Sequence, residues 1–246
     1  MVERLAIVGL QYSVYILEFA LVVYLLVKGH LRRLSGLFIY LCGLFLIDAV
    51  GRPFVLYRYG FNSSQYGYVY WLSDAFLELT AFVLVCVLFR RACQEKPKLW
   101  ESVRLLLGCV FILVFAVSLF SLSSHHDQLL TRFIIEFEQN LYFTCLVLNT
   151  LLYILLQHTE SADEELGLLV CGLGIQFAGP AACYALLYLV PGWSHAYTVN
   201  NILGQACTMG MLLTWFYAIA RVHEPVQVPA PSKLELAPAE AMPRDL

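Results

Sequence analysis

Four-residue steps place polar side chains in line along two apolar segments of the chain. Asp74 and Glu78 are four residues apart, and so are Asn201 and Gln205, a spacing that puts two side chains on one face of a helix. Two carboxylates that face one cavity repel each other unless a proton or a cation relieves the repulsion. The pattern therefore predicts a site for a small polar or cationic ligand. Its other expected contacts are polar or aromatic side chains: Gln176, Trp71, Tyr70 and Tyr197.

A second pair of charged residues has opposite signs. Asp48 precedes Arg52 by four residues, so the two side chains can pair on one helix face and lower the cost of lying in hydrocarbon. We interpret this pair as structural. Three more acids lie within apolar segments and are candidates for proton-coupled function: Glu18, Glu136 and Glu138.

Histidines gather in two loops, where they could bind a metal ion or titrate near neutral pH. His125, His126 and Asp127 lie in one loop and His195 in another. We favour the interpretation that these are solvated loop side chains, and we expect neither a metal nor a cofactor. Hydrolase and phosphate-loop motifs are absent, and no lysine lies deep in an apolar segment where it could hold retinal. The sequence therefore does not predict an enzyme.

The composition indicates the environment that must hold these polar groups. Of the 246 residues, 60% are hydrophobic and only 13% are charged, against about 25% charged in soluble domains. The mean hydropathy is +0.72. A net charge of -3 leaves no basic footprint, so nucleic acid is not an expected partner. The lipid bilayer is the expected surrounding of this chain.

Seven apolar stretches, each about twenty residues long, match the length of a helix that crosses the hydrocarbon core. They are Ala6–Val27, Leu34–Tyr57, Tyr68–Phe89, Val103–Leu122, Arg132–Leu156, Leu166–Val190 and Ala196–Ile219. The predicted fold class is all-α, a seven-transmembrane helix bundle over residues 1–222. Residues 223–246 are rich in Pro and Ala, a composition typical of a disordered tail.

Lysine and arginine collect in alternate connections between the stretches. The first connection holds Lys28, Arg32 and Arg33, and the third holds a second basic group that includes Arg90 and Arg91. Because positive loops stay in the cytoplasm, we expect the amino terminus outside and the carboxyl terminus in the cytoplasm.

With this orientation, most intramembrane polar residues lie in the outer half of the bundle, which predicts a polar, acidic chamber open to the outside. Pro53 and Pro180 also fall in the outer half, where each can free a backbone carbonyl and bend its helix. Hydrogen bonding between helices is the competing interpretation for the single amides.

The two halves of the chain echo each other. Tyr70, Asp74 and Glu78 have the same spacing as Tyr197, Asn201 and Gln205, and residues 42–44 and 171–173 both read Cys-Gly-Leu. This echo predicts a 3+1+3 pseudo-repeat with the fourth segment as a linker. Parallel repeats of this kind occur in transporters.

The stretch with Asp48, Arg52-Pro53, Tyr59-Gly60, Tyr66 to Tyr70 and Asp74 resembles that of bacterial seven-helix integral membrane proteins to which no activity is attached. The resemblance implies an integral protein of the bacterial inner membrane, and it implies no site residue.

Three functions from different classes fit these features. The first is a sensor or receptor-like protein that binds a small polar or cationic ligand from outside, and which needs a cytoplasmic signalling partner. The second is a solute transporter, proton-coupled through Glu78 or Glu18. The third is a structural or accessory subunit of a membrane complex, with the other subunits as partners. We rank the sensor first.

Overall fold

The computed structural model describes residues 2–29, 33–61, 63–94, 96–122, 129–158, 163–189 and 196–221. Within these ranges it describes all side chains except those of residues 2–6, 121–122, 129–132, 183–189, 196–198 and 200–201. Several predictions made from the sequence therefore lie outside the described part of the chain. These concern the tail 223–246, the loop residues His125, His126, Asp127 and His195, and the side chains of Tyr197 and Asn201.

All regular secondary structure in the described chain is helical. The elements are α1 (Val2–Val27), α2 (Ser35–Phe45), η2 (Leu46–Gly51), α3 (Arg52–Tyr59), α4 (Ser64–Ala92), α5 (Pro97–Leu122), α6 (Leu129–His158), α7 (Glu164–Leu189) and α8 (Ala196–Arg221). Together, α2, η2 and α3 make one continuous span, so the described residues contain seven segments long and apolar enough to cross a membrane. The predicted all-α class with seven such helices is confirmed.

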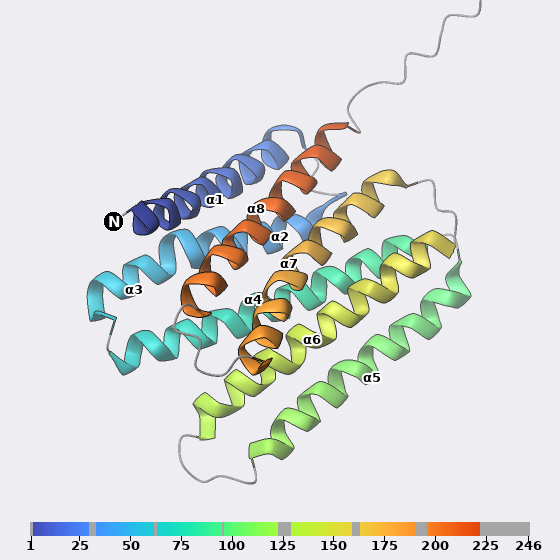
Figure 1. Cartoon of the computed structure of the whole chain (residues 1–246). Helices are drawn as coiled ribbons and strands as arrows, with labels where there is room; N and C mark the ends of the chain where they lie inside the picture. Colours follow the sequence, from blue (N-terminus) through green and yellow to red (C-terminus); the bar gives the residue numbers. More distant parts are fainter. Residues whose placement is uncertain are drawn as a thin grey trace, which may run out of the picture.

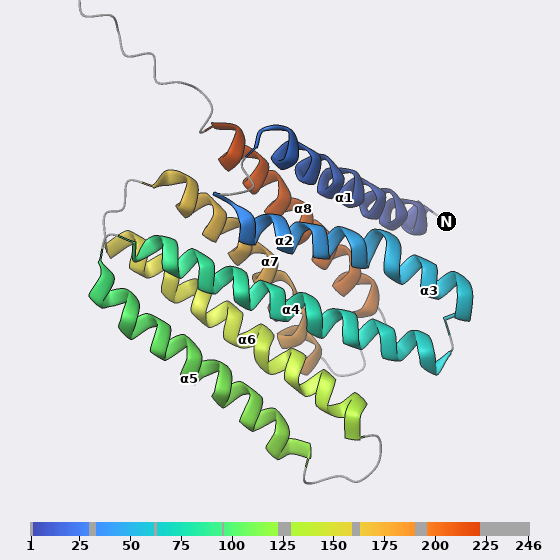
Figure 2. The same ribbon diagram turned by 180° about the vertical axis from the view of Figure 1, so that it is seen from behind.

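The helices pack side by side as an elongated bundle (Figure 1). Following the contacts, α1 packs on α2 and α8, α2 on α4, α4 on α6, α6 on α7, and α7 on α8, which closes a ring. Helix α5 lies outside this ring against α6 and α4, at the edge of the bundle in both views (Figure 2). We call the end where α1 begins the N-terminal end, and the end where α8 finishes the C-terminal end.

The second span changes its helix type at its centre. Pro53 has no N–H to donate, and its ring would clash with the carbonyl four residues earlier in a regular α-helix. The chain instead widens into the π-helix η2 over Leu46–Gly51, and α3 then begins with Pro53 in its first turn. Asp48 lies in η2 and Arg52 begins α3. By contrast, Pro180 lies inside α7, which continues to Leu189.

Helix α4 begins at Ser64, four residues before the predicted start at Tyr68. The reason is a cap that the apolar pattern does not contain, because the Ser63 hydroxyl accepts a hydrogen bond of 3.1 Å from the backbone N–H of Tyr66. Asp74 and Glu78 lie ten and fourteen residues after Ser64, which corresponds to about 15 and 21 Å along the helix. Both acids therefore lie further from the start of their helix than the apolar pattern indicated.

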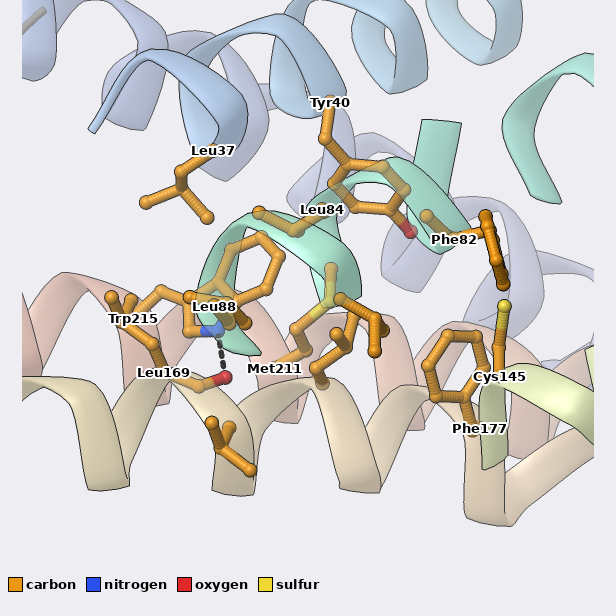
Figure 3. Close-up of a cluster of buried hydrophobic side chains, with 14 of the residues drawn as sticks. Leu37, Tyr40, Phe82, Leu84, Leu88, Cys145, Leu169, Phe177, Met211 and Trp215 are labelled. Atoms are coloured by element: carbon orange, nitrogen blue, oxygen red, sulfur yellow. Dashed lines mark hydrogen bonds between the residues drawn. The ribbon is translucent and has the colours of Figure 1, made fainter. Parts of the chain in front are cut away.

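The ring is filled by a core of large apolar side chains, shown in Figure 3. Trp215 of α8 is fully buried, and its indole nitrogen donates a hydrogen bond of 2.9 Å to the carbonyl oxygen of Leu169 in α7. The outer surface is also apolar, with exposed side chains such as Ile16 and Ile112. A surface of this kind is expected where lipid replaces water.

Two glycines let α7 approach α8 closely. A Cβ atom at Gly172 would lie 2.7 Å from the Trp215 ring, and one at Gly179 would meet the sulfur of Cys207. The two glycines are seven residues apart and therefore share one face of α7. Small residues at such positions allow helix backbones to pack in contact within a membrane.

We expect Gly172→Ala to lower the unfolding temperature of the purified protein, because the added methyl group meets the Trp215 ring. Overpacking of this kind costs about 1–3 kcal/mol. Gly167→Ala is the matched control on α7, since a Cβ there meets nothing within 4 Å. Thermal unfolding in detergent, followed by circular dichroism, compares the two variants. Equal unfolding temperatures for both would contradict the close approach of α7 and α8.

Candidate functional site

Acidic side chains from four parts of the ring gather inside the bundle. Glu78 lies within electrostatic range of Glu138 and Asp74, and Glu138 within range of Asp74. Glu18 in turn lies within range of Asp48. We call these five residues the acidic cluster: Glu18 of α1, Asp48 of η2, Asp74 and Glu78 of α4, and Glu138 of α6.

Arg52 joins two members of this cluster, Asp48 and Asp74. Its Nη1 lies 2.8 Å from Asp48 Oδ1, and its Nη2 donates a hydrogen bond to Asp74 Oδ1. Its Nε donates to the Ser73 hydroxyl at 3.2 Å, and the guanidinium lies 4.5 Å from the centre of the Tyr70 ring. The contact between Asp48 and Arg52 that the sequence predicted is thus present, but Asp74 shares the same guanidinium.

Four acids of the cluster have a buried oxygen without a hydrogen-bond partner among the described residues, and of these only Asp48 has an ion pair at that oxygen, with Arg52. Glu18 is 0% exposed, and neither of its carboxyl oxygens has a hydrogen-bond partner among the described residues. One buried oxygen of Glu78 and one of Glu138 are in the same situation in that part of the chain. Burying a carboxylate without a counter-charge costs several kcal/mol. These groups therefore need a proton or a cation.

Tyrosines line the cluster on its apolar side. Tyr40 of α2 is buried, and its hydroxyl lies within electrostatic range of Glu78, Asp48 and Glu18. Figure 3 shows its ring extending from α2 towards α4. Sequence reasoning did not single out Tyr40, because an aromatic residue in an apolar helix resembles ordinary core. The available signal was its spacing of eight residues from Asp48, which places both on one side of the span.

The predicted ligand-binding residues divide into three groups. Asp74, Glu78 and Tyr70 lie in or beside the acidic cluster, and Tyr70 is a hydrogen-bond neighbour of Asp74. Gln176 and Gln205 each have a buried side-chain oxygen with no partner among the described residues, and no described contact joins them to the cluster. For Asn201 and Tyr197 only the helical backbone is described.

Trp71 lies further towards the N-terminal end. Its ring packs edge-on against Tyr70 with 5.5 Å between centroids, and it lines a cavity of about 690 Å³ together with Tyr59 and Tyr68. A second cavity lies at the C-terminal end of the bundle. Neither of these two cavities is lined by an acidic residue of the cluster. The predicted polar chamber around Asp74 and Glu78 therefore stays a prediction.

Of the acids predicted for proton coupling, two belong to the cluster and one does not. Glu18 and Glu138 are cluster members, whereas Glu136 is half-buried and has no described contact with them. In the described part of the chain, no three His, Cys, Asp or Glu side chains are placed to share one metal ion. The acids are thus neighbours in pairs and do not form a common coordination shell.

The fold and the cluster define a class of protein: a multi-pass bundle of membrane-spanning length, with acidic groups buried between its helices. Comparisons with protein-family models, with curated proteins and with solved structures give no match to this chain. The geometry of the cluster is therefore what supports a function.

We expect Arg52→Gln to destabilise the protein strongly, because Asp48 and Asp74 would lose their shared counter-charge. Removing one partner of a buried ion pair costs about 3–5 kcal/mol. Arg58→Gln is the control, since Arg58 is exposed in the last turn of α3. Adding Asp48→Asn and Asp74→Asn to Arg52→Gln should restore part of the lost stability. Thermal unfolding in detergent tests this, and a triple variant no more stable than Arg52→Gln would contradict it.

Proposed function

We propose that the protein is a receptor-like sensor that binds a small organic cation in the acidic cluster from the outer side of the membrane. The supporting observation is the set of buried, unpartnered carboxyl oxygens on Glu18, Glu78 and Glu138. The guanidinium of Arg52 is already engaged by Asp48 and Asp74, so it forms no ion pair with these three acids, of which Glu138 alone lies within its electrostatic range.

The surroundings of the cluster suit an ammonium group. Glu78 and Glu138 approach from α4 and α6, so a cation between them would neutralise both carboxylates. The hydroxyl of Tyr40 lies within electrostatic range of Glu78, and the ring of Tyr70 already holds the Arg52 guanidinium, as ring faces attract cations by about 0.5–2 kcal/mol each. An inorganic metal ion is less well matched, because no three ligands converge in the described part of the chain.

We place the access route to the cluster at the cavity of the N-terminal end. Its wall includes Trp71, which is three residues from Asp74 and therefore on the same side of α4. Tyr59 and Tyr68 also line this cavity. Their aromatic rings can attract an organic cation as it moves along the wall.

The proposed orientation places this cavity outside and the C-terminal end in the cytoplasm. Described basic residues gather at the C-terminal end, including Lys28, Arg33, Arg91 and Lys98, while the other end holds Arg4, Arg58 and Arg132. This asymmetry fits the positive-inside rule, and we propose the inner membrane of a bacterium as the location.

Cysteine labelling tests the orientation. In a variant with its native cysteines replaced, Gln65→Cys should react with a membrane-impermeant maleimide in intact cells, because Gln65 is exposed near the start of α4. Lys98→Cys, near the start of α5, should react only after permeabilisation. The reverse pattern would contradict the orientation and the outward access route.

Transport of the same cation is a second candidate, and the order of the ring is compatible with it. Exchanging α1, the α2–α3 span and α4 with α6, α7 and α8 turns each ring contact into another ring contact, and α5 remains outside. A 3+1+3 duplication would produce this order, and repeats of that kind are common in transporters. The sensor remains first, because the packed core around Trp215, Leu84 and Leu88 leaves no described polar path towards the C-terminal end.

A binding experiment tests the sensor. Purified protein in nanodiscs is titrated with methylammonium, tetramethylammonium and guanidinium, each with a neutral analogue, and its unfolding temperature is measured. A ligand at one hundred times its Kd should stabilise the fold by about 2.7 kcal/mol. Glu78→Gln and Glu138→Gln should abolish this gain, because both acids lie in the cluster.

Glu136→Gln is the matched control on α6, since Glu136 lies outside the cluster. Failure of all three cations, or equal loss in Glu136→Gln, would contradict the proposal. Uptake of the stabilising cation into liposomes that disappears in Glu78→Gln would instead select the transporter.

A further inference from the structure

A cavity of about 690 Å³ opens at the C-terminal end of the bundle. It lies beside the end of α4 and the start of α5, next to the segments that precede α2 and α7. Its wall contains three guanidinium groups and few other charges. The residues relevant here are Arg33, Arg90, Arg91, Gln94, Trp100 and Asp163.

Arg91 is the structural member of this group. Its Nη2 lies 2.6 Å from Glu165 Oε2 and 2.8 Å from Asp163 Oδ2, and its Nε donates to Asp163 Oδ2 at 3.0 Å. Asp163 also accepts a hydrogen bond from the backbone N–H of Leu166 in the first turn of α7. These contacts tie the end of α4 to the start of α7, so Arg91 is committed to the fold.

The other two arginines retain unused donors. Arg33 donates from one nitrogen to Glu165, and its side chain is still 51% exposed. Arg90 is exposed and forms no ion pair with a described residue. Asp163 and Glu165 are both occupied by Arg91, so three guanidinium groups face two carboxylates. The described groups leave one positive charge in excess.

The rest of the cavity wall suits an anionic group that is attached to an apolar one. The cavity reaches Pro97, where α5 begins, and the start of a helix carries positive potential. Two carbonyls at the end of α4 are occupied, because Phe89 and Arg91 accept hydrogen bonds from the backbone N–H groups of Cys93 and Gln94. Burial raises the pKa of the Cys93 thiol, so this wall residue stays neutral. Trp100 adds an aromatic face.

We infer that this cavity binds the phosphate group of an anionic ligand through Arg33 and Arg90. The planar guanidinium fork matches phosphate oxygens in pairs. The ligand is either the headgroup of an acidic phospholipid or a soluble phosphate. The position at the helix ends, beside Trp100, favours the lipid, since basic pockets and tryptophan are typical of the membrane interface. The site lies at the opposite end of the bundle from the Trp71 cavity and is independent of the proposed cation sensor.

Native mass spectrometry of the full chain tests the lipid. Protein in detergent is mixed with phosphatidylglycerol or with phosphatidylcholine, and the retained lipid is counted. We expect preferential retention of phosphatidylglycerol, reduced about tenfold in the double variant Arg33→Gln/Arg90→Gln, as expected for lost hydrogen bonds to a charged group. Arg104→Gln is the matched control, because Arg104 is exposed near the same end but does not line the cavity.

Calorimetry with inorganic phosphate is the second arm. Phosphatidylglycerol binding without phosphate binding assigns a lipid headgroup, and phosphate binding that the double variant abolishes assigns a soluble anion. The inference is overturned if neither probe binds, or if Arg104→Gln loses as much binding as the double variant. The single variant Arg90→Gln should unfold at the wild-type temperature, since Arg90 has no described ion pair. It should also keep any cation binding at the acidic cluster.

Discussion

A single guanidinium holds together the charged interior of this bundle. Arg52 contacts Asp48 across the junction of η2 and α3, Asp74 on α4, and the ring of Tyr70. Water is scarce inside a span, so each buried carboxylate needs a partner supplied by the protein. This contact depends on the π-helix of the second span, which positions Arg52, and on the packing of α3 against α4, which brings Asp74 to it. The same limited supply of positive charge leaves Glu18, Glu78 and Glu138 without partners in the described chain.

The bundle combines two kinds of packing. The apolar core packs by shape, with Gly172 making room for Trp215 and Leu169 accepting its indole hydrogen. The C-terminal end is tied by charge, through Arg91 and the acids that begin α7. Between these firmly packed regions and the N-terminal end lies the acidic cluster. A rigid core next to an incompletely neutralised polar region is an arrangement that a bound cation could alter locally without disturbing the whole fold.

Much of the fold could be predicted from the sequence, because the length of an apolar stretch and the charged residues that bound it are local properties. The contact between Asp48 and Arg52 also followed from spacing on one helix. The involvement of Asp74 did not, because apolar helices surrounded by lipid have weak periodicity, so the rotation of one helix against another cannot be read from them. The same reason hid the meeting of Glu18 with Asp48 and of Glu78 with Glu138. The sequence pattern also did not single out Glu165 in the first turn of α7, which is buried against Arg91 and Arg33.

The π-helix in the second span sets the directions in which the side chains of its two halves point. An α-helix turns about 100° per residue, so the extra residue accommodated within Leu46–Gly51 shifts the angular phase of everything that follows. Before η2, the side chains of Leu37 and Tyr40 lie in the apolar core. After it, the Arg52 side chain points to Asp74. One span can therefore present apolar side chains to α4 in its first half and a charged side chain to α4 in its second half. A shortening of η2 by one residue would return the two halves to a common phase and separate the charge from its partner.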